Sequence, residues 1–483
     1  MGVSLYTIRV VLETLGAVDY GLYNVVGGIV TMFAFLSNAM ANASQRFFAF
    51  ELGLKNYDQL KRTFSMTMTI YFIIAVLILI LGETVGLWVL NTQMTIPPER
   101  IGTVHWVYQF SIFSFMMTIV SIPYTAVIMA NEKMNAYAYI SFIEVCLKLL
   151  VVYLLLFFSF DKLALYAILI FVATTITTIT YIIYARKIFK ECHYSFYWKT
   201  SLFKEIIGYS GWTLLGSLVY VFRNQGVNIL INIFFNPVIN AAQAIAFRVN
   251  SLLLNLTNNF HTAVRPQIIK NYSKNAINEL ENLVISSSLY AYFLMVLLSF
   301  PLLVETNFIL SLWLKEVPNY TIIFSRIILL NTLIEVINPP IVTAIQATGN
   351  IKLYQIVISV TQLLIFPFSY LFYNLGYPPQ TSYIIMVFLS FISLIPRLLI
   401  LQKTTTLSAK NYINKFLPKI LSVSFICFIP LIIVHYLLPE GIIRLITILT
   451  TDLLFSTFII YLIGLTTNEK IYVKKFIMSK ISK

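Results

Sequence analysis

The chain repeats itself, and the repeated unit is a run of hydrophobic segments long enough to span a membrane. Residues 123–137 (PYTAVIMANEKMNAY) correspond to residues 340–354 (PIVTAIQATGNIKLY), each near the end of an apolar stretch. Arg46 and Arg265 also stand at matching places, and each is followed at the same distance by a Lys-Asn dipeptide. A repeat of this size inside a hydrophobic chain is typical of membrane transporters built from two equivalent lobes.

The composition places the chain among membrane proteins. Hydrophobic residues make up 59% of its 483 residues and charged residues only 11%, whereas soluble proteins carry about 25% charged residues. Each spanning helix needs ~20 apolar residues. We predict spans at residues 20–43, 64–90, 105–130, 138–159, 163–184, 209–235, 237–260, 284–305, 320–345, 353–373, 381–401, 416–438 and 441–465. No segment is long and polar enough for a soluble domain, so we do not expect an enzyme.

The formal charge of +14 follows the membrane topology. When successive loops are given alternate sides, one set holds most basic residues, including the linker at 185–208 and the Lys-rich tail at 470–483. The other set holds little beyond Arg100, Lys162, Lys315 and Arg444. This asymmetry is what the positive-inside rule requires. We therefore place the basic loops and the C-terminus in the cytoplasm, and we do not expect nucleic-acid binding.

The predicted architecture is all-α and polytopic, with two pseudo-symmetric six-helix lobes, two additional helices and a central cavity. We assign residues 1–184 to the N-terminal lobe and 185–208 to a basic cytoplasmic linker. Residues 209–402 form the C-terminal lobe, and 403–483 the two last helices and a basic tail. Thirteen clear spans is an odd number, so one is missing. We interpret the segment 1–15 as the outer half of a first helix that is apparently truncated. Either the short helix is native, or the start codon was assigned too late.

Polar stripes on spanning helices identify the expected cavity walls, because a polar group facing lipid is costly. Asn38 and Asn42 share a helical face of the span at 20–43, and Asn224 and Asn250 belong to the polar pair of spans at 209–260. The ionised groups on these segments are mainly arginines, which suit phosphate recognition. We predict substrate binding by Arg9, Arg46, Arg223, Arg248 and Arg265.

Other readings compete with a binding role for several of these residues. Arg46 and Arg265 could simply mark cytoplasmic helix ends, and Glu13 could neutralise Arg9 one helical turn away. Glu335, near two asparagines, could be an ion-coupling site or could serve structural hydrogen bonding. The three cysteines suggest neither a disulfide framework nor a metal site. No nucleotide-binding loop or catalytic layout is present in the sequence, so we expect no cofactor and no metal.

Three segments resemble polysaccharide flippases of the multidrug/oligosaccharidyl-lipid/polysaccharide exporter superfamily: residues 12–28 (LETLGAVDYGLYNVVGG), 43–48 (ASQRFF) and 240–248 (NAAQAIAFR). The resemblance covers the whole chain and implies two six-helix lobes plus two helices. Similar flippases carry cationic residues on the cavity side of the first, second and eighth helices, where Arg9, Arg46, Arg248 and Arg265 fall. The shortened first helix departs from this pattern and leaves one cavity wall incomplete.

The resemblance implies a function in surface polysaccharide biosynthesis, for O-antigen, lipopolysaccharide, capsule or exopolysaccharide. Similar proteins move undecaprenyl-diphosphate-linked oligosaccharide from the cytoplasmic to the outer leaflet of the bacterial inner membrane, and we expect alternating access here. Expected partners are the polyprenyl-diphosphate-linked oligosaccharide, membrane lipid, and polysaccharide polymerases and glycosyltransferases. The alternatives are a multidrug/cation antiporter of the same superfamily, whose cavity would need carboxylates, and a lipid II flippase. A membrane glycosyltransferase would need larger outer loops, and a scaffold would not need polar cavity helices.

Overall fold

The computed structural model describes residues 34–92, 96–158, 161–235, 237–314, 317–467 and 469–471. It also describes, singly, Thr7, Val10, Val11, Thr14, Leu15, Gly16, Asp19, Leu22, Tyr23, Val26 and Lys474. Throughout these residues the regular structure is helical and contains no strand. The chain divides into two compact units, Met1–Ser217 and Leu218–Lys483. An all-helical membrane fold is therefore confirmed. Arg9, and most of the span predicted at 20–43, lie outside the described residues.

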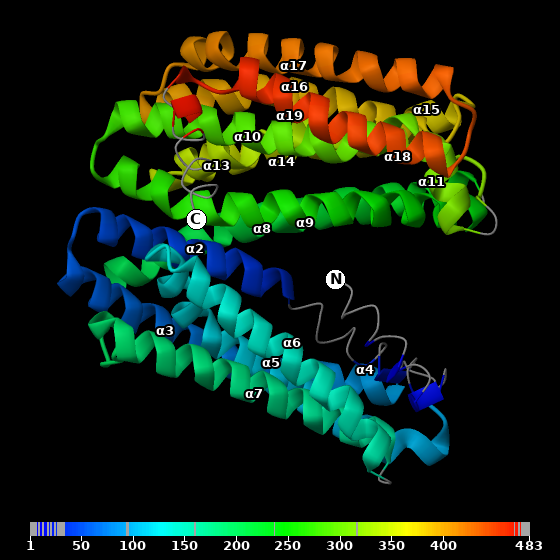
Figure 1. The fold of residues 1–483 in the computed structure, drawn as a ribbon. Coiled ribbons are helices and arrows are strands. Elements are labelled where there is room, and N and C mark those ends of the chain that lie inside the picture. The colour runs from blue at the N-terminus through cyan, green and yellow to red at the C-terminus, as the bar shows by residue number, and fades with distance from the viewer. Residues whose placement is uncertain are drawn as a thin grey trace. The chain divides into compact units, whose positions relative to one another are not determined.

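The first unit contains long helices joined by short turns (Figure 1). Its elements are α2 (Ala34–Gly53), α3 (Tyr57–Leu81), η1 (Gly82–Gly86), α4 (Leu87–Thr92), η2 (Pro98–Arg100), α5 (Ile101–Ala130), α6 (Met134–Phe157), α7 (Lys162–Ile188), η3 (Lys190–Cys192) and the first part of α8 (Thr200–Phe234). Local signals place two helix starts. The Asn56 side chain accepts from the Gln59 backbone N–H before α3, and Asp161 accepts from Leu163 and Ala164 before α7.

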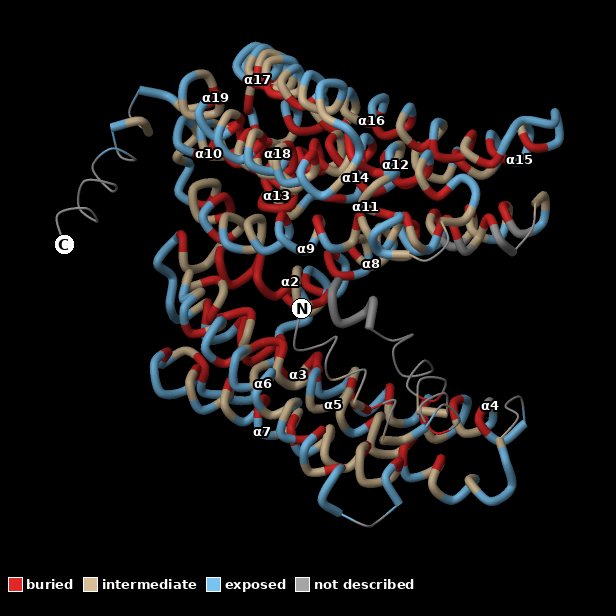
Figure 2. Tube along the Cα trace, turned by 45° about the vertical axis from the view of Figure 1, so that its right-hand side comes forward, coloured by how far each residue is buried: buried red, intermediate tan, exposed pale blue. Residues whose placement is uncertain are grey.

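The second unit contains the rest of α8 and all later elements (Figure 1). These are α9 (Pro237–Ser273), α10 (Ile277–Val304), α11 (Thr306–Trp313), α12 (Thr321–Glu335), α13 (Asn338–Ala347), α14 (Lys352–Leu363), α15 (Ile365–Asn374), α16 (Thr381–Thr405), α17 (Ala409–Leu437), α18 (Ile442–Thr451), η4 (Asp452–Ser456), α19 (Thr457–Ile459) and η5 (Ile460–Gly464). One span is broken between α12 and α13, because Pro339 and Pro340 occupy the first turn of α13 and cannot continue α12. Figure 2 shows buried residues on the helix faces that turn toward neighbouring helices, and exposed residues along α17.

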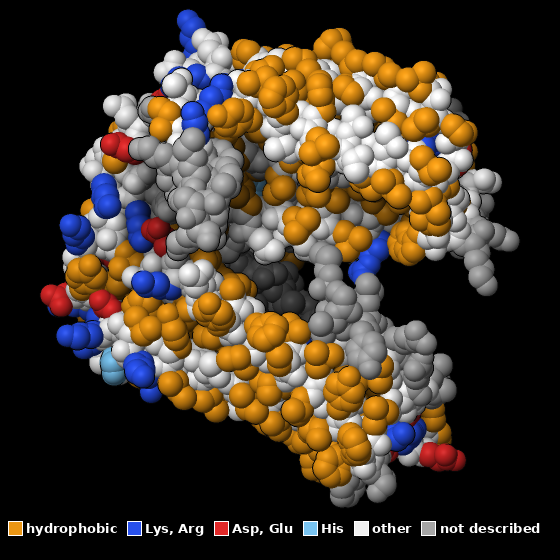
Figure 3. Space-filling view, viewed as in Figure 1, with side chains coloured by type: hydrophobic (Ala, Val, Ile, Leu, Met, Phe, Trp, Pro, Cys, Tyr) orange, Lys and Arg blue, Asp and Glu red, His pale blue; other side chains and the backbone are white. Residues whose placement is uncertain are grey.

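Within the described residues, 11 helices are long and apolar enough to cross a membrane. Each coincides with a span predicted from the sequence. Residues 237–260 do form a helix, the first part of α9, but α9 is not among those 11. In Figure 3, hydrophobic side chains cover the middle of each unit, and basic side chains gather at one end of its helices.

The sequence repeat reappears as matched turns in the two units. Glu132 in the turn between α5 and α6 has a positive φ of 61°, and Gly349 in the turn between α13 and α14 has a φ of 79°. These residues occupy the same position of the repeated segment. The turns after α2 and α9 also contain one left-handed residue each, Lys55 and Asn275. The repeat therefore fixes the places where the chain reverses as well as its hydrophobic pattern.

Candidate functional site

A group of charged side chains inside a spanning segment surrounds Glu335, the last residue of α12. Its Oε2 accepts a hydrogen bond from Asn338 Nδ2 at 2.9 Å, and its Oε1 accepts one from Ser390 Oγ at 2.8 Å. The break before α13 places Asn338 where it can reach back to this carboxylate. Two arginines flank the group. Arg223 Nη1 lies 3.8 Å from Oε1, and Arg397 Nη2 lies 3.9 Å from Oε2.

Arg397 is the more firmly held of the two arginines. It lies in α16 and is 4% exposed. Its Nη1 donates to Tyr354 Oη at 2.6 Å, and its Nε donates to Ser393 Oγ at 3.4 Å. Its guanidinium carbon also lies 5.8 Å from the centre of the Tyr354 ring. These contacts use the directional donors of the guanidinium and fix its position beside Glu335.

Arg223 is buried to a similar extent but is held less tightly. It lies in α8, is 7% exposed, and has its guanidinium carbon 5.4 Å from the centre of the Tyr220 ring. Its Nε has no hydrogen-bond partner among the described residues. The 3.8 Å separation from Glu335 is an ion pair without a hydrogen bond. Arg223 therefore has hydrogen-bonding capacity that the described residues do not use.

Arg223 and Glu335 open onto a cavity of about 570 Å³ in the second unit. Its lining combines this ion pair with amide side chains and a few apolar ones. The amides are Asn224, Asn250, Asn258, Asn331 and Gln362. Asn250 Oδ1 accepts from Thr332 Oγ1 at 2.7 Å, and Asn331 Oδ1 is buried without a partner among the described residues. Amides and arginine together provide the donors and acceptors that sugar hydroxyls and phosphates need.

The charge balance of this group favours an anion. Two arginines and one glutamate give +2 − 1 = +1 among the described ionised side chains that line the cavity or contact Glu335. An arginine stays charged even when it is buried. A surplus cation in a spanning segment is costly, and a bound anion would offset it.

The structure brings together four of the residues predicted from the sequence: Arg223, Asn224, Asn250 and Glu335. Arg397 was not among them. Its signal was an arginine inside the predicted span at 381–401, on the same helical face as Ser390 and Ser393. Only the fold places it beside Glu335.

The other predicted residues lie elsewhere. Arg248 is exposed and does not line the cavity, and Arg265 Nη2 donates to Gln346 Oε1 at 2.9 Å. In the first unit, Arg46 is 5% exposed, with Nη1 3.8 Å from Glu205 Oε1 and its guanidinium carbon 4.7 Å from the centre of the Phe47 ring. Asn42 is half-buried in α2, and the side chain of Asn38 lies outside the described part. Substrate binding by these residues stays a prediction.

No group of three or more His, Cys, Asp or Glu side chains that could hold a metal ion occurs among the described residues. The neighbours of Glu335, which the sequence offered as an ion-coupling site, are arginines and hydrogen-bond donors. Ion coupling by Glu335 stays a prediction.

Solved structures of other proteins share this fold. A MOP superfamily transporter from Pyrococcus furiosus Vc1, whose binding pocket of reverse polarity is said to suggest a different function, aligns with a TM-score of 0.67 at 14% identity, over 84% of this chain and 93% of that one. The MATE transporter ClbM, solved with Rb⁺, aligns with a TM-score of 0.68 at 15% identity, over 85% and 94%. A variant of the Vibrio cholerae MATE transporter VcmN aligns with a TM-score of 0.62 at 16% identity, over 83% and 92%.

The chain thus has the fold of MATE transporters of the MOP superfamily, along most of its length. No protein-family model matches the sequence, and no curated protein matches it either.

Proposed function

We propose that the chain is a flippase that moves polyprenyl-diphosphate-linked oligosaccharide across the bacterial cytoplasmic membrane, from the inner to the outer leaflet. The observation that carries this proposal is Arg223, a buried arginine with donors to spare in an amide-lined cavity. Arginine binds phosphate oxygens through a planar fork of N–H groups, and amides hydrogen-bond to sugar hydroxyls. This combination matches the two polar parts of a lipid-linked sugar diphosphate.

Glu335 and Arg397 act in this proposal as a positioning pair. Arg397 is fixed by Tyr354 and Ser393. It lies beside Oε2 of Glu335, whereas Arg223 lies beside Oε1. Glu335 then competes with the substrate diphosphate for the Arg223 guanidinium. Binding of the diphosphate weakens the Arg223–Glu335 ion pair, and release of the head group restores it. Competition from the Glu335 carboxylate therefore helps the substrate diphosphate to dissociate from Arg223.

The membrane potential supports the direction of transport. Positive-inside topology places the basic loops and the C-terminus in the cytoplasm. An inside-negative potential favours outward movement of an anion by about 2.3 kcal/mol per charge per 100 mV across the full field. The substrate would then supply material to polymerases and glycosyltransferases that build a surface polysaccharide.

A multidrug/cation antiporter is the second candidate, and a specific observation favours it. Among the structures that share this fold is one described as a multidrug resistance MATE family transporter. A cationic drug needs an available carboxylate. Glu335 is the only acid that lines the cavity in the described part of the chain, and two arginines flank it. The charge of the cavity therefore favours the anionic substrate.

The proposal is tested in a strain that lacks this gene, complemented with wild type, Arg223→Gln or Arg326→Gln. Arg326 is the matched control, because it is an exposed arginine of the same unit and does not line the cavity. We expect loss of surface polymer and trapping of lipid-linked precursor on the cytoplasmic side with Arg223→Gln only. Unchanged polymer in the deletion strain, together with increased sensitivity to cationic dyes, would favour the antiporter instead.

A further inference from the structure

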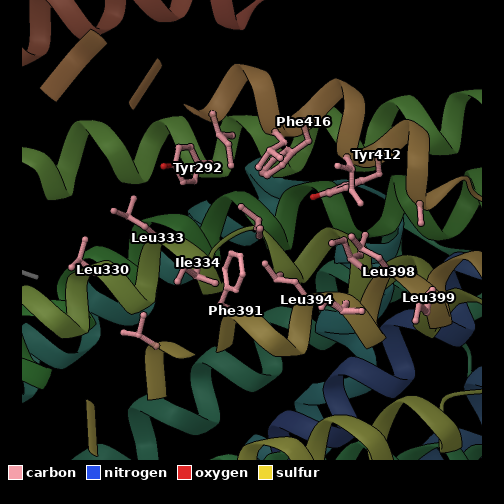
Figure 4. Close-up of a pocket in the computed structure, with 18 residues that line it drawn as sticks. Tyr292, Leu330, Leu333, Ile334, Phe391, Leu394, Leu398, Leu399, Tyr412 and Phe416 are labelled. Atoms are coloured by element: carbon pink, nitrogen blue, oxygen red, sulfur yellow. The ribbon is translucent and has the colours of Figure 1, made fainter. Parts of the chain in front are cut away.

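A second cavity of the second unit differs in kind from the amide-lined one. It has a volume of about 620 Å³ and is lined by 18 side chains from α10, α12, α13, α16 and α17. Only Tyr292 and Tyr412 among them carry a polar atom. Figure 4 shows Tyr292, Phe416 and Tyr412 on one side, facing Leu333, Ile334, Phe391, Leu394 and Leu398 on the other. We call this the apolar groove.

The apolar groove opens outward from the unit, because several of its wall residues are largely exposed. On α16, Phe391 is 61% exposed and Leu399 is 61% exposed, and on α17, Leu417 is 44% exposed. These residues belong to helices long and apolar enough to cross a membrane, and their exposed apolar side chains are suited to the hydrocarbon of the bilayer. Hydrocarbon is the medium that matches an apolar lining, and a lipid chain is its natural occupant.

The length and position of the apolar groove identify which lipid reaches it. Its wall on α17 runs from Ala409 to Ile420, eleven residue steps or ~16 Å at 1.5 Å per residue. The hydrocarbon core of a bilayer is about 30 Å thick, so this wall spans about one leaflet. It starts at the turn between α16 and α17, which the positive-inside rule assigns to the cytoplasm. The groove therefore matches an acyl chain of the cytoplasmic leaflet.

Basic side chains stand at the same end of the apolar groove. Lys403 follows the lining residue Leu399 by one helical turn, and Lys410 is adjacent to the lining residue Ala409. Both lysines are exposed. Lys415, further along α17, has its Nζ 3.9 Å from Glu281 Oε1 of α10 and is partly neutralised. Lysines at the cytoplasmic membrane surface attract anionic lipid head groups.

We propose that the apolar groove binds an acyl chain of an anionic phospholipid of the cytoplasmic leaflet, with the lipid phosphate held at Lys403 and Lys410. The bound lipid bridges α16 and α17, and thereby fastens the two last spanning helices to the rest of the second unit. This site is separate from the amide-lined cavity, which uses the opposite faces of α12 and α16. The proposal does not depend on the transported substrate.

Native mass spectrometry of the purified full-length protein, with phosphatidylglycerol or phosphatidylcholine added, tests the charge requirement. We expect the wild type to retain phosphatidylglycerol at a concentration at least tenfold below that needed for phosphatidylcholine. The double variant Lys403→Gln/Lys410→Gln should lose this preference. The control Lys415→Gln should keep it. Equal retention of the two lipids by the wild type, or an unchanged preference in the double variant, would overturn the proposal.

A groove-filling variant, Leu417→Trp, tests the position of the acyl chain. Its melting temperature in lipid-free detergent shows whether it folds as the wild type does, and Ile413→Trp is the alternative if it does not. We expect loss of retained phosphatidylglycerol, and loss of the rise in melting temperature that this lipid gives the wild type. Unchanged retention in a folded variant contradicts the proposal. Displacement of phosphatidylglycerol by undecaprenyl phosphate at equal concentration would assign the groove to the polyprenyl chain instead and also overturn it.

Discussion

Arg223 Nη1 lies 3.8 Å from Oε1 of Glu335, close enough for an ion pair and too far for a hydrogen bond. Asn338 and Ser390 supply the hydrogen bonds to that carboxylate, and Arg397 supplies a second cation. Glu335 is therefore well stabilised without Arg223. The reverse does not hold, because Arg223 keeps a buried Nε with no partner among the described residues. Because Arg223 has fewer hydrogen bonds than Glu335, we expect Arg223 to be the member of this pair that binds a ligand.

Glu335→Gln should strengthen anion binding and slow turnover. The substitution removes the competitor for Arg223 and raises the local charge from +1 to +2. An anionic head group should then bind at least severalfold more tightly and leave more slowly. Binding and transport measured on the same reconstituted preparation check this. Weaker anion binding by a folded Glu335→Gln protein would contradict the role of competitor.

Arg397→Gln should destabilise the second unit. Removal of one partner from a buried ion pair costs about 3–5 kcal/mol when no other counter-charge remains. Arg223 remains beside Glu335, so we expect a loss near the lower end of that range. Tyr354 and Ser393 also lose their donor. Denaturant unfolding in detergent measures the change. The control Arg326→Gln, at an exposed position, loses weak hydrogen bonds to Leu303 O and Thr306 Oγ1 and should alter stability by no more than about 1 kcal/mol. Similar losses for the two variants would show that Arg397 is not held as described.

Asp161 should make the stability of the first unit sensitive to acid. It lies in the turn before α7, outside the spanning segments, and caps that helix. Burial acts to raise its pKa, but hydrogen bonds from Thr103 and the Leu163 and Ala164 backbone, with the charge of Arg100, outweigh burial and lower the pKa below 3.8. A carboxyl with a lowered folded-state pKa contributes stability that is present above its unfolded pKa and lost as pH falls through the folded pKa.

The stability of the wild type should therefore decrease as pH falls from about 4 through the lowered pKa. Asp161→Asn should be less stable than the wild type at neutral pH, and its stability should change less over this pH range. Asparagine can still cap the helix, so at neutral pH only the charge and the half-exposed ion pair with Arg100 are lost, which should amount to about 0.5–1 kcal/mol. Melting temperatures of both proteins between pH 3 and 7 measure the two curves. Parallel curves would exclude Asp161 as a source of the acid sensitivity.

Gly86→Ala should disrupt the packing of η1 against α5. A Cβ at this position would lie 1.8 Å from Tyr108 Oη, and that hydroxyl donates to the Gly82 carbonyl at 2.7 Å. Tyr108 is almost fully buried and has no room to withdraw. The double variant Gly86→Ala/Tyr108→Phe removes the clashing oxygen and should recover part of the lost melting temperature. Gly102→Ala, where nothing lies within 4 Å of the new Cβ, is the control.

The sequence predicted the spans well because hydropathy alone decides which segments cross a membrane. It also found Arg223, Asn224, Asn250 and Glu335, since polar residues on spanning helices must face protein or a cavity. It did not resolve which of Arg248 and Asn250 faces the cavity. These residues are two apart on α9, about 200° around the helix, so they point in different directions. Periodicity gives the faces of a helix, and the packing of its neighbours decides which face is buried.

Arg397 shows the other limit of sequence reasoning. Its partners Tyr354 and Glu335 come from different helices, far along the chain, and no local pattern connects them. The break between α12 and α13 could have been predicted from the sequence, because Pro339 and Pro340 cannot continue a helix. Recognition of that break would have indicated that Asn338 turns back toward Glu335.

Binding of a lipid diphosphate to the purified protein is the most direct test of the central claim. The dissociation constant of undecaprenyl diphosphate would be measured for wild type, Arg223→Gln and Arg326→Gln, beside that of the cation tetraphenylphosphonium. We expect that Arg223→Gln weakens diphosphate binding at least tenfold, that Arg326→Gln does not change it, and that the cation binds poorly to all three. Equal diphosphate binding by wild type and Arg223→Gln, or tight binding of the cation by the wild type, would contradict this proposal.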